Sequence, residues 1–118
     1  MTIERRNVGK RLSDLVIYAP PPGGRLVYLA GQVAENRKAD ITGQTRSVLQ
    51  QIDRLLDEAG TDKSQILSAT IYLADMADFA AMNAVYASYF EPPYPARTTI
   101  QAAGLPLGAF VEMEIIAE

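Results

Sequence analysis

Arg97 and Glu112 are the two residues of this sequence whose types and settings best suit chemistry. Arg97 follows Pro95-Ala96 at the start of a predicted strand, where the proline stiffens the approach and restricts the directions of the guanidinium. An arginine held in this way can bind a carboxylate through two parallel hydrogen bonds. Glu112 interrupts an apolar strand, and partial burial would raise the pKa of its carboxyl and suit it to hold or activate water. We expect Arg97 to face Glu112 in one site.

Both residues also have an ordinary interpretation. Arg97 could be a surface arginine in a weak salt bridge. Glu112 could belong to a solvated strand face, because Glu114 lies two residues further on and therefore on the same face. Spacing alone leaves both interpretations open.

The residue types that the chain lacks narrow the chemistry. Its 118 residues include no cysteine and no histidine, which excludes disulfides, thiol nucleophiles, serine–histidine triads and the usual Cys/His zinc sites. Proton transfer must use carboxylates, lysine, arginine, tyrosine, hydroxyls, backbone amides or water. The sequence has no phosphate-binding glycine loop, dinucleotide fingerprint or metal-spaced carboxylate cluster, so we predict no cofactor and no metal.

Length and charge predict a small protein that binds neither nucleic acid nor a membrane. A chain of 118 residues that is 48% hydrophobic is the size of a single domain, residues 1–118, with one sizeable core. Its 11 basic and 14 acidic residues form no basic stripe for nucleic acid. No apolar run is long enough to span a bilayer, and the polar stretch Met1–Arg11 is unlike a secretory signal. We therefore expect a cytoplasmic location.

The elements that must position Arg97 and Glu112 follow from hydrophobic periodicity. Strands are predicted at residues 15–18, 25–30, 66–73, 97–103 and 110–116, and helices at residues 40–59 and 75–90. Asp40 is a good N-cap for the first helix, and Gly60 suits the left-handed position just past its end. The stretch Pro20–Gly24 is expected to form a rigid excursion ending in a turn, and Gly31-Gln32 to end the second strand.

This order predicts an α+β fold with a single mixed sheet and two helices packed on one face. Residues 104–108 are expected to make the turn between the last two strands. Both faces of the strand at residues 25–30 are apolar, which predicts cover on both sides. The face of the sheet away from the helices would then lie in a subunit interface.

Tyrosines, an asparagine and a glycine could complete a pocket. Tyr18, Tyr28, Tyr86 and Tyr94 are possible pocket walls, although an aromatic at helical spacing such as Tyr86 is equally a core residue. Asn83 could lie on the surface or reach a neighbouring subunit. Gly31 could allow close backbone approach to a ligand, or could mark only a turn.

Six short strings support a resemblance that covers the chain from about residue 12 to its end. They are Leu29-Ala30-Gly31-Gln32, Ala69–Asp75, Asp78-Phe79, Asn83–Tyr86, Pro95–Thr99, and Leu105-Pro106 followed by Val111–Glu114. Each string is weak alone, but their order and spacing resemble the Rid family of reactive-intermediate deaminases, also called the YjgF family. The resemblance implies a chorismate-mutase-like fold, a homotrimer, and a ligand pocket in each of three subunit clefts.

The resemblance also implies an activity and its residues. It implies hydrolysis of reactive 2-enamine and 2-imine acids, such as 2-aminoacrylate, to 2-oxo acids and ammonia, as in a 2-iminobutanoate/2-iminopropanoate deaminase, without a cofactor. The family's carboxylate-binding arginine matches Arg97 and its water-holding glutamate matches Glu112. The glycine near the substrate matches Gly31, and the helix asparagine matches Asn83.

Some positions depart from the family pattern. Thr99 stands where many members have a cysteine, and its hydroxyl is expected to contact the ligand. Ala30 stands where a serine is frequent, which removes a polar contact. The family's aromatic wall maps to Tyr18, with Tyr86 and Tyr94 also expected at the pocket. Three alternatives therefore stay open. The protein could be a trimer that binds small carboxylates without catalysis, or a pathway-specific enamine or amide hydrolase of the same fold. It could also be a protein-interaction or chaperone-like trimer in which Arg97 is only structural.

Overall fold

A computed structural model describes residues 2–9, 12–19 and 23–118 of the chain. The predicted excursion at Pro20–Gly24 falls largely outside these residues. No helix within the described ranges is long and apolar enough to cross a membrane.

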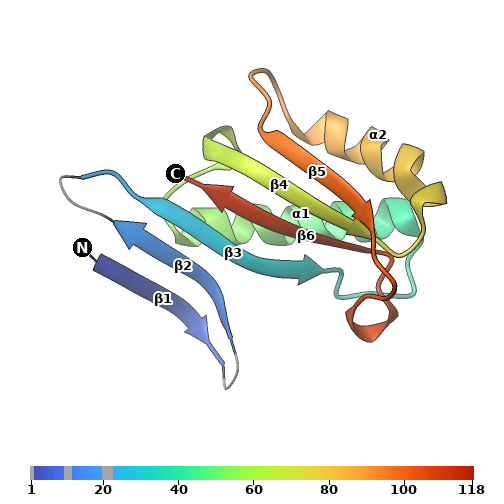
Figure 1. Ribbon diagram of the computed structural model, residues 1–118, viewed down its shortest axis with the longest axis horizontal. Coiled ribbons are helices and arrows are strands. Elements are labelled where there is room, and N and C mark those ends of the chain that lie inside the picture. The colour runs from blue at the N-terminus through green and yellow to red at the C-terminus, as the bar shows by residue number, and fades with distance from the viewer. Residues whose placement is uncertain (1, 10–11, 20–22) are drawn as a thin grey trace.

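Six strands form a single mixed sheet (Figure 1). The strands are β1 (Thr2–Val8), β2 (Ser13–Ala19), β3 (Leu26–Val33), β4 (Ile66–Leu73), β5 (Ala96–Gln101) and β6 (Val111–Ala117). Their order across the sheet is β1-β2-β3-β6-β4-β5. Only the β4–β5 pair is parallel among these neighbours, and the connection between these two strands contains a helix, as parallel pairs require.

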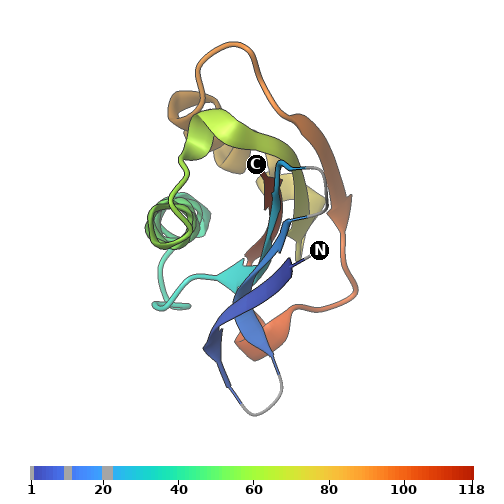
Figure 2. The ribbon, with the colours of Figure 1, turned by 90° about the vertical axis from the view of Figure 1, so that its left-hand side faces the viewer.

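Helices α1 (Ile41–Glu58) and α2 (Phe79–Tyr89) lie on the same side of this sheet, as predicted (Figure 2). Asp40 caps α1 by accepting a hydrogen bond from the Gly43 amide at 2.8 Å. Gly60 follows the helix with a positive φ of 75°, which is the left-handed conformation expected there. The predicted capping residues at the start and end of α1 are therefore confirmed.

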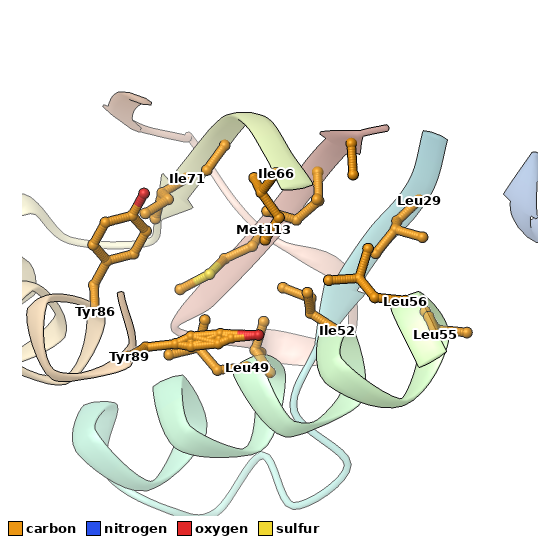
Figure 3. Close-up of a cluster of buried hydrophobic side chains, with 14 of the residues drawn as sticks. Leu29, Leu49, Ile52, Leu55, Leu56, Ile66, Ile71, Tyr86, Tyr89 and Met113 are labelled. Carbon is orange, nitrogen blue, oxygen red and sulfur yellow. The ribbon is translucent and has the colours of Figure 1, made fainter. Parts of the chain in front are cut away.

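The core lies between the helices and one face of the sheet (Figure 3). On β6 the alternate residues Val111, Met113 and Ile115 are buried, while Glu112 and Glu114 are directed to the opposite face. We call that opposite face, which carries no helix, the open face. Tyr28 on the open face is 40% exposed, so the predicted cover on both sides of β3 is absent within one chain.

The predicted turn between the last two strands is wrong. β5 lies at the edge of the sheet and pairs with β4, whereas β6 inserts between β3 and β4. Residues 102–110 therefore cross the end of β4 and contain a short 3₁₀ turn, Pro106–Gly108. Local turn residues suggested a hairpin, but the register is set by burial of the β6 residues in the middle of the sheet.

Three element boundaries also differ from the prediction. β3 continues through Gly31 to Val33, because a bulge between Leu29 and Gln32 accommodates the glycine. α2 begins at Phe79, since Asp75 caps a separate 3₁₀ turn at Met76–Asp78. β1 was not expected at all, because its residues are almost all polar or exposed.

Candidate functional site

Arg97 extends from β5 toward α2. It is the register partner of buried Ala69 on β4, so its side chain lies on the helix side of the sheet. Its Nη1 donates a 2.6 Å hydrogen bond to Oδ1 of Asn83 on α2. Its Cζ lies 4.7 Å from the ring centroid of Tyr86 and 5.4 Å from that of Phe79, within the range of cation–π contacts. The helix therefore orients the guanidinium from one side.

The other edge of this guanidinium remains available. Arg97 is exposed, and within the described residues only its Nη1 has a hydrogen-bond partner. Nε and Nη2 form the parallel pair of donors that a carboxylate prefers. Arg97 is therefore held by α2 on one side, and its Nε–Nη2 edge has the geometry that suits a carboxylate.

Glu112 lies on the open face of the sheet. Its register partners are Tyr72 on β4 and Val33 on β3. Burial raises the pKa of the Glu112 carboxyl above its ordinary value, and the negative charge of Glu114 raises it further. A carboxylate with a raised pKa accepts a proton more readily near neutral pH, which suits a general base.

Gly31 lies directly beneath the Glu112 carboxylate. A Cβ at position 31 would overlap Oε2 of Glu112 and would lie 3.0 Å from its Cδ. The glycines with positive φ are Gly24, Gly60 and Gly108, so Gly31 is not needed for an unusual backbone conformation. Its missing side chain instead provides the space in which the carboxylate lies.

Arg97 and Glu112 do not face each other within one chain, contrary to the sequence-based expectation. Arg97 is on the helix side of the sheet, and Glu112 is on the open face. Their strand positions were predicted, but β4 separates β5 from β6 and the alternation of side chains places the two on opposite faces. A site that uses both residues must therefore combine two copies of the chain.

The other expected pocket residues differ in where the structure places them. Asn83, Tyr86 and Tyr94 gather around Arg97 and line one hollow with it. The Thr99 hydroxyl oxygen is shielded from solvent and, within the described residues, has no hydrogen-bond partner, so its contact with a ligand stays a prediction. The Tyr86 hydroxyl is likewise buried and unpaired, and it points from α2 toward the sheet (Figure 3).

Tyr18 lies far from Glu112 within the chain. Tyr18 pairs with Leu26 at one end of β3, whereas Glu112 pairs with Val33 at the other end. Seven residues of strand correspond to about 23 Å. The structure therefore does not bring Tyr18 and Glu112 together.

The sequence-based prediction did not include Phe79, whose ring lies against Arg97. Phe79 lies four residues before Asn83 and therefore on the same helix face, and this spacing was the signal that could have identified it.

Solved structures share this fold over nearly the whole chain. A protein from Pseudomonas aeruginosa has a TM-score of 0.89 and 38% identity, with 98% of this chain and 97% of that chain covered. NMB1025 from Neisseria meningitidis, described as a member of the YjgF protein family, has a TM-score of 0.88 and 37% identity, with 99% and 94% covered. The fold thus defines a class of small α+β proteins to which these solved structures belong.

The sequence comparisons place the chain within that class. The family model described as Endoribonuclease L-PSP matches residues 10–118. The RutC family protein YoaB of Escherichia coli is 42% identical over 118 residues, covering 99% of this chain and 98% of YoaB. Reactive Intermediate Deaminase A, a chloroplastic protein of Arabidopsis thaliana, is 43% identical over 98 residues, covering 78% of this chain and 52% of that protein. The chain belongs to this family, the YjgF or Rid family, and the resemblance seen in the sequence is confirmed.

Proposed function

We propose that this protein hydrolyses 2-imino and 2-enamino carboxylic acids to 2-oxo acids and ammonia. The observation that carries the proposal is the setting of Arg97, whose guanidinium is held by Asn83 and Tyr86 while its Nε–Nη2 edge stays available. The deaminase relative supports the same chemistry. RNA cleavage would require a surface that attracts phosphates, whereas this chain has 14 acidic and 11 basic residues.

The reaction needs only positioning and one proton acceptor. Arg97 binds the substrate carboxylate, and an enamine substrate first takes a proton at C3 to become the imine. Water held by Glu112 adds to the electrophilic C2, and Glu112 accepts the proton that this water loses. The imine reacts in its protonated form, so return of that proton to the nitrogen makes an –NH3+ leaving group. The C2–N bond then breaks to release ammonia, and the C2 hydroxyl gives its proton to Glu112 as it becomes the carbonyl of the 2-oxo acid. Fixing the reactants in this way can supply a large part of the rate enhancement.

The site is proposed to form between subunits. Arg97 of one chain would meet Glu112 and Gly31 of the next, because the two residues occupy opposite faces of one sheet. The open face also exposes apolar side chains, among them Tyr28 (40%) and Ile100 (44%), that a second copy would cover. A cyclic homotrimer, as the family resemblance implies, would give three equivalent sites.

A coupled deamination assay tests the function. An amino-acid oxidase with catalase generates imino acids in place, and the rate of 2-oxo acid formation is followed with and without the protein. We expect the wild type to accelerate this rate and Arg97→Ala to lose at least about 100-fold. Arg97→Lys keeps the charge but not the parallel donors, so it should also be strongly impaired.

Arg54→Ala is the matched control, because Arg54 is an exposed arginine on α1 whose nearest carboxylate oxygen is 3.9 Å away. It should retain wild-type activity. Full activity of a correctly assembled Arg97→Ala protein would contradict the role of Arg97. Saturable binding of a small carboxylate without any acceleration would instead identify a binding protein.

A further inference from the structure

Two hydroxyl groups close to Arg97 are buried without a partner. The hydroxyl oxygens of Tyr86 on α2 and Thr99 on β5 are shielded from solvent, and among the described residues neither has a hydrogen-bond partner. Tyr86 as a whole is only 7% exposed. Buried hydroxyls are nearly always hydrogen-bonded, because burying such a group without a partner costs free energy. Both groups therefore require a partner.

The two hydroxyls lie in the layer between α2 and the sheet. Ile71 on β4 is fully buried on the helix side, and Thr99 is its register partner on β5. Partners on neighbouring strands direct their side chains to the same face, so Thr99 also points toward the helices. The Tyr86 hydroxyl points from α2 toward Ile71 (Figure 3). The two hydroxyls thus approach Ile71, one from the helix and one from the strand.

A water molecule suits these two groups better than a substrate does. Both oxygens are shielded from solvent, so a ligand on the exposed edge of Arg97 does not reach them. One water can join hydroxyl oxygens up to about 5.5 Å apart, since each O–H···O bond spans about 2.7–2.8 Å. Burial raises the pKa of the Tyr86 phenol, and the charge of Arg97 only partly opposes this. The phenol therefore keeps its proton at neutral pH, and both hydroxyls can donate as well as accept.

A link between these hydroxyls would act on Arg97 through the tyrosine ring. Cζ of Arg97 lies 4.7 Å from the centroid of the Tyr86 ring, so the direction of the ring decides where the face of the guanidinium rests. Asn83 fixes only Nη1. Thr99 lies two residues beyond Arg97 on the same face of β5. A bond to Thr99 therefore ties the ring to the strand that carries the arginine.

We propose that Tyr86 and Thr99 share one buried water, and that this link makes Thr99 a positioning residue for Arg97. The Thr99 hydroxyl then serves the site from inside the fold and does not touch the substrate. The effect on turnover rests on the proposed function, whereas the link itself requires no activity. Bonds through an ordered water are nearly as favourable as direct ones.

Removal of one or both hydroxyls tests the shared link. Thr99→Val and Tyr86→Phe each keep the shape of the side chain but leave the other hydroxyl without its bridge, so each should lower the urea midpoint of unfolding. The double variant should lose no more than the worse single variant, because no buried hydroxyl is then left unpaired. Losses that add in the double variant would overturn the link.

Crystal structures of the wild type and Thr99→Val show the link directly. One ordered water within hydrogen-bond distance of both hydroxyl oxygens is expected in the wild type. Its loss, with a turned Tyr86 ring, is expected in Thr99→Val. A wild-type structure in which the two hydroxyls bind different groups, or in which Thr99 contacts a bound 2-oxo acid, would overturn the proposal.

The positioning role is measured by carboxylate binding. Calorimetry with pyruvate should give a Kd at least about fivefold higher for Thr99→Val, and Thr99→Ser, which keeps the hydroxyl, should stay within about twofold of the wild type. Thr45→Val is the matched control, because this buried threonine on α1 donates to the Ile41 carbonyl at 2.7 Å and should leave the Kd unchanged. In the imine assay, Thr99→Val should raise KM more than it lowers kcat.

The positioning role and the proposed function fail in different ways. Pyruvate binding without any imine hydrolysis would refute the function, and the Kd values would still decide the role of Thr99. A Thr99→Val protein with the wild-type Kd would overturn that role. If the wild type bound no pyruvate, the crystal structures would decide: a displaced guanidinium in Thr99→Val supports the role, and an unmoved one rejects it.

Discussion

Gly31 is the residue that fixes where the Glu112 carboxylate can lie. Because its backbone conformation is open to any residue, Gly31→Ala should fold, yet the new methyl would displace the flexible end of Glu112. We predict a fall in kcat of at least about tenfold with a much smaller change in KM, since Arg97, the proposed carboxylate ligand, is untouched.

Gly104→Ala is the matched control, because no atom lies within 4 Å of a Cβ built at that position. Steady-state kinetics of both variants check the prediction. A Gly31→Ala protein with wild-type kcat would show that the position of Glu112 does not limit the reaction.

The pair Glu112 and Glu114 makes activity depend on pH. In the proposed mechanism water is activated by ionised Glu112, so kcat/KM should rise with pH through the raised pKa of this carboxyl. Removing the charge of Glu114 lowers that pKa, so Glu114→Gln should move the rising limb of the pH profile to lower pH. Glu91→Gln, which removes an exposed charge elsewhere, should leave the limb in place.

The same pKa shift affects stability with a defined sign. The folded protein binds the Glu112 proton more tightly than the unfolded chain, so stability falls as pH rises from the ordinary glutamate range through the raised pKa. Glu112→Gln should show a flatter dependence of the urea midpoint on pH. An identical dependence in the two proteins would contradict the burial of Glu112.

At the residue scale, Arg97 and Glu112 could be identified from the sequence, but their placement on opposite faces of the sheet could not. Strand alternation correctly separated Glu112 from buried Val111 and Met113. The face of Arg97 depended on its pairing with Ala69 on β4, which is 28 residues earlier in the chain. Such a register has no local signal.

At the element scale, Gln44 joins three parts of the fold. It is fully buried on α1; its Nε2 donates to the carbonyls of Arg37 at 3.1 Å and Ala39 at 3.0 Å, and its Oε1 accepts from the Phe110 amide at 2.9 Å. The loop after β3 and the residue before β6 are thereby tied to one helix. β3 carries Gly31 and β6 carries Glu112, so Gln44 is linked to both of these strands.

Gln44→Met keeps the approximate volume but leaves those backbone groups without partners. We predict a loss of about 3 kcal/mol in the free energy of unfolding, because each unsatisfied buried group costs about 1–3 kcal/mol. Gln50→Met, at an exposed position on the same helix, should change it by less than about 0.5 kcal/mol. Urea unfolding at a fixed protein concentration measures both, and similar values for the two variants would contradict the role of Gln44.

The elements themselves could largely be predicted, because helix α1 and strands β2, β4 and β6 have strong local periodicity. β1 could not, since both its faces are exposed and its order depends on pairing with β2. Arg6 adds a contact from β1 to the Glu58 carbonyl at the end of α1. The sequence also could not show that β6 lies between β3 and β4, because strand order is decided by burial across the whole sheet.

At the scale of the whole molecule, the proposed function gives one chain two half-sites. Arg97 with Asn83 forms one on the helix side, and Glu112 with Gly31 forms the other on the open face. Neither half can hydrolyse an imine alone under the proposed chemistry. Assembly of identical chains is therefore a condition for activity as well as for covering the open face.

Mixing of two inactive variants tests this shared site most directly. Arg97→Ala and Glu112→Gln proteins, each assembled alone, should be inactive in the imine assay. In a random equal mixture, three quarters of trimers contain both chains, and each of these has one native site out of three. Activity should therefore return to about a quarter of the wild-type value.

The mixture is prepared by co-expression with different tags, so that assemblies containing both chains can be isolated. Co-expression of the double variant Arg97→Ala/Glu112→Gln with Arg97→Ala should give no recovery, because no chain then supplies the arginine. Recovered activity in the first mixture and none in the second is the predicted result. No recovery in assemblies shown to contain both single variants would contradict a site built from Arg97 of one chain and Glu112 of another.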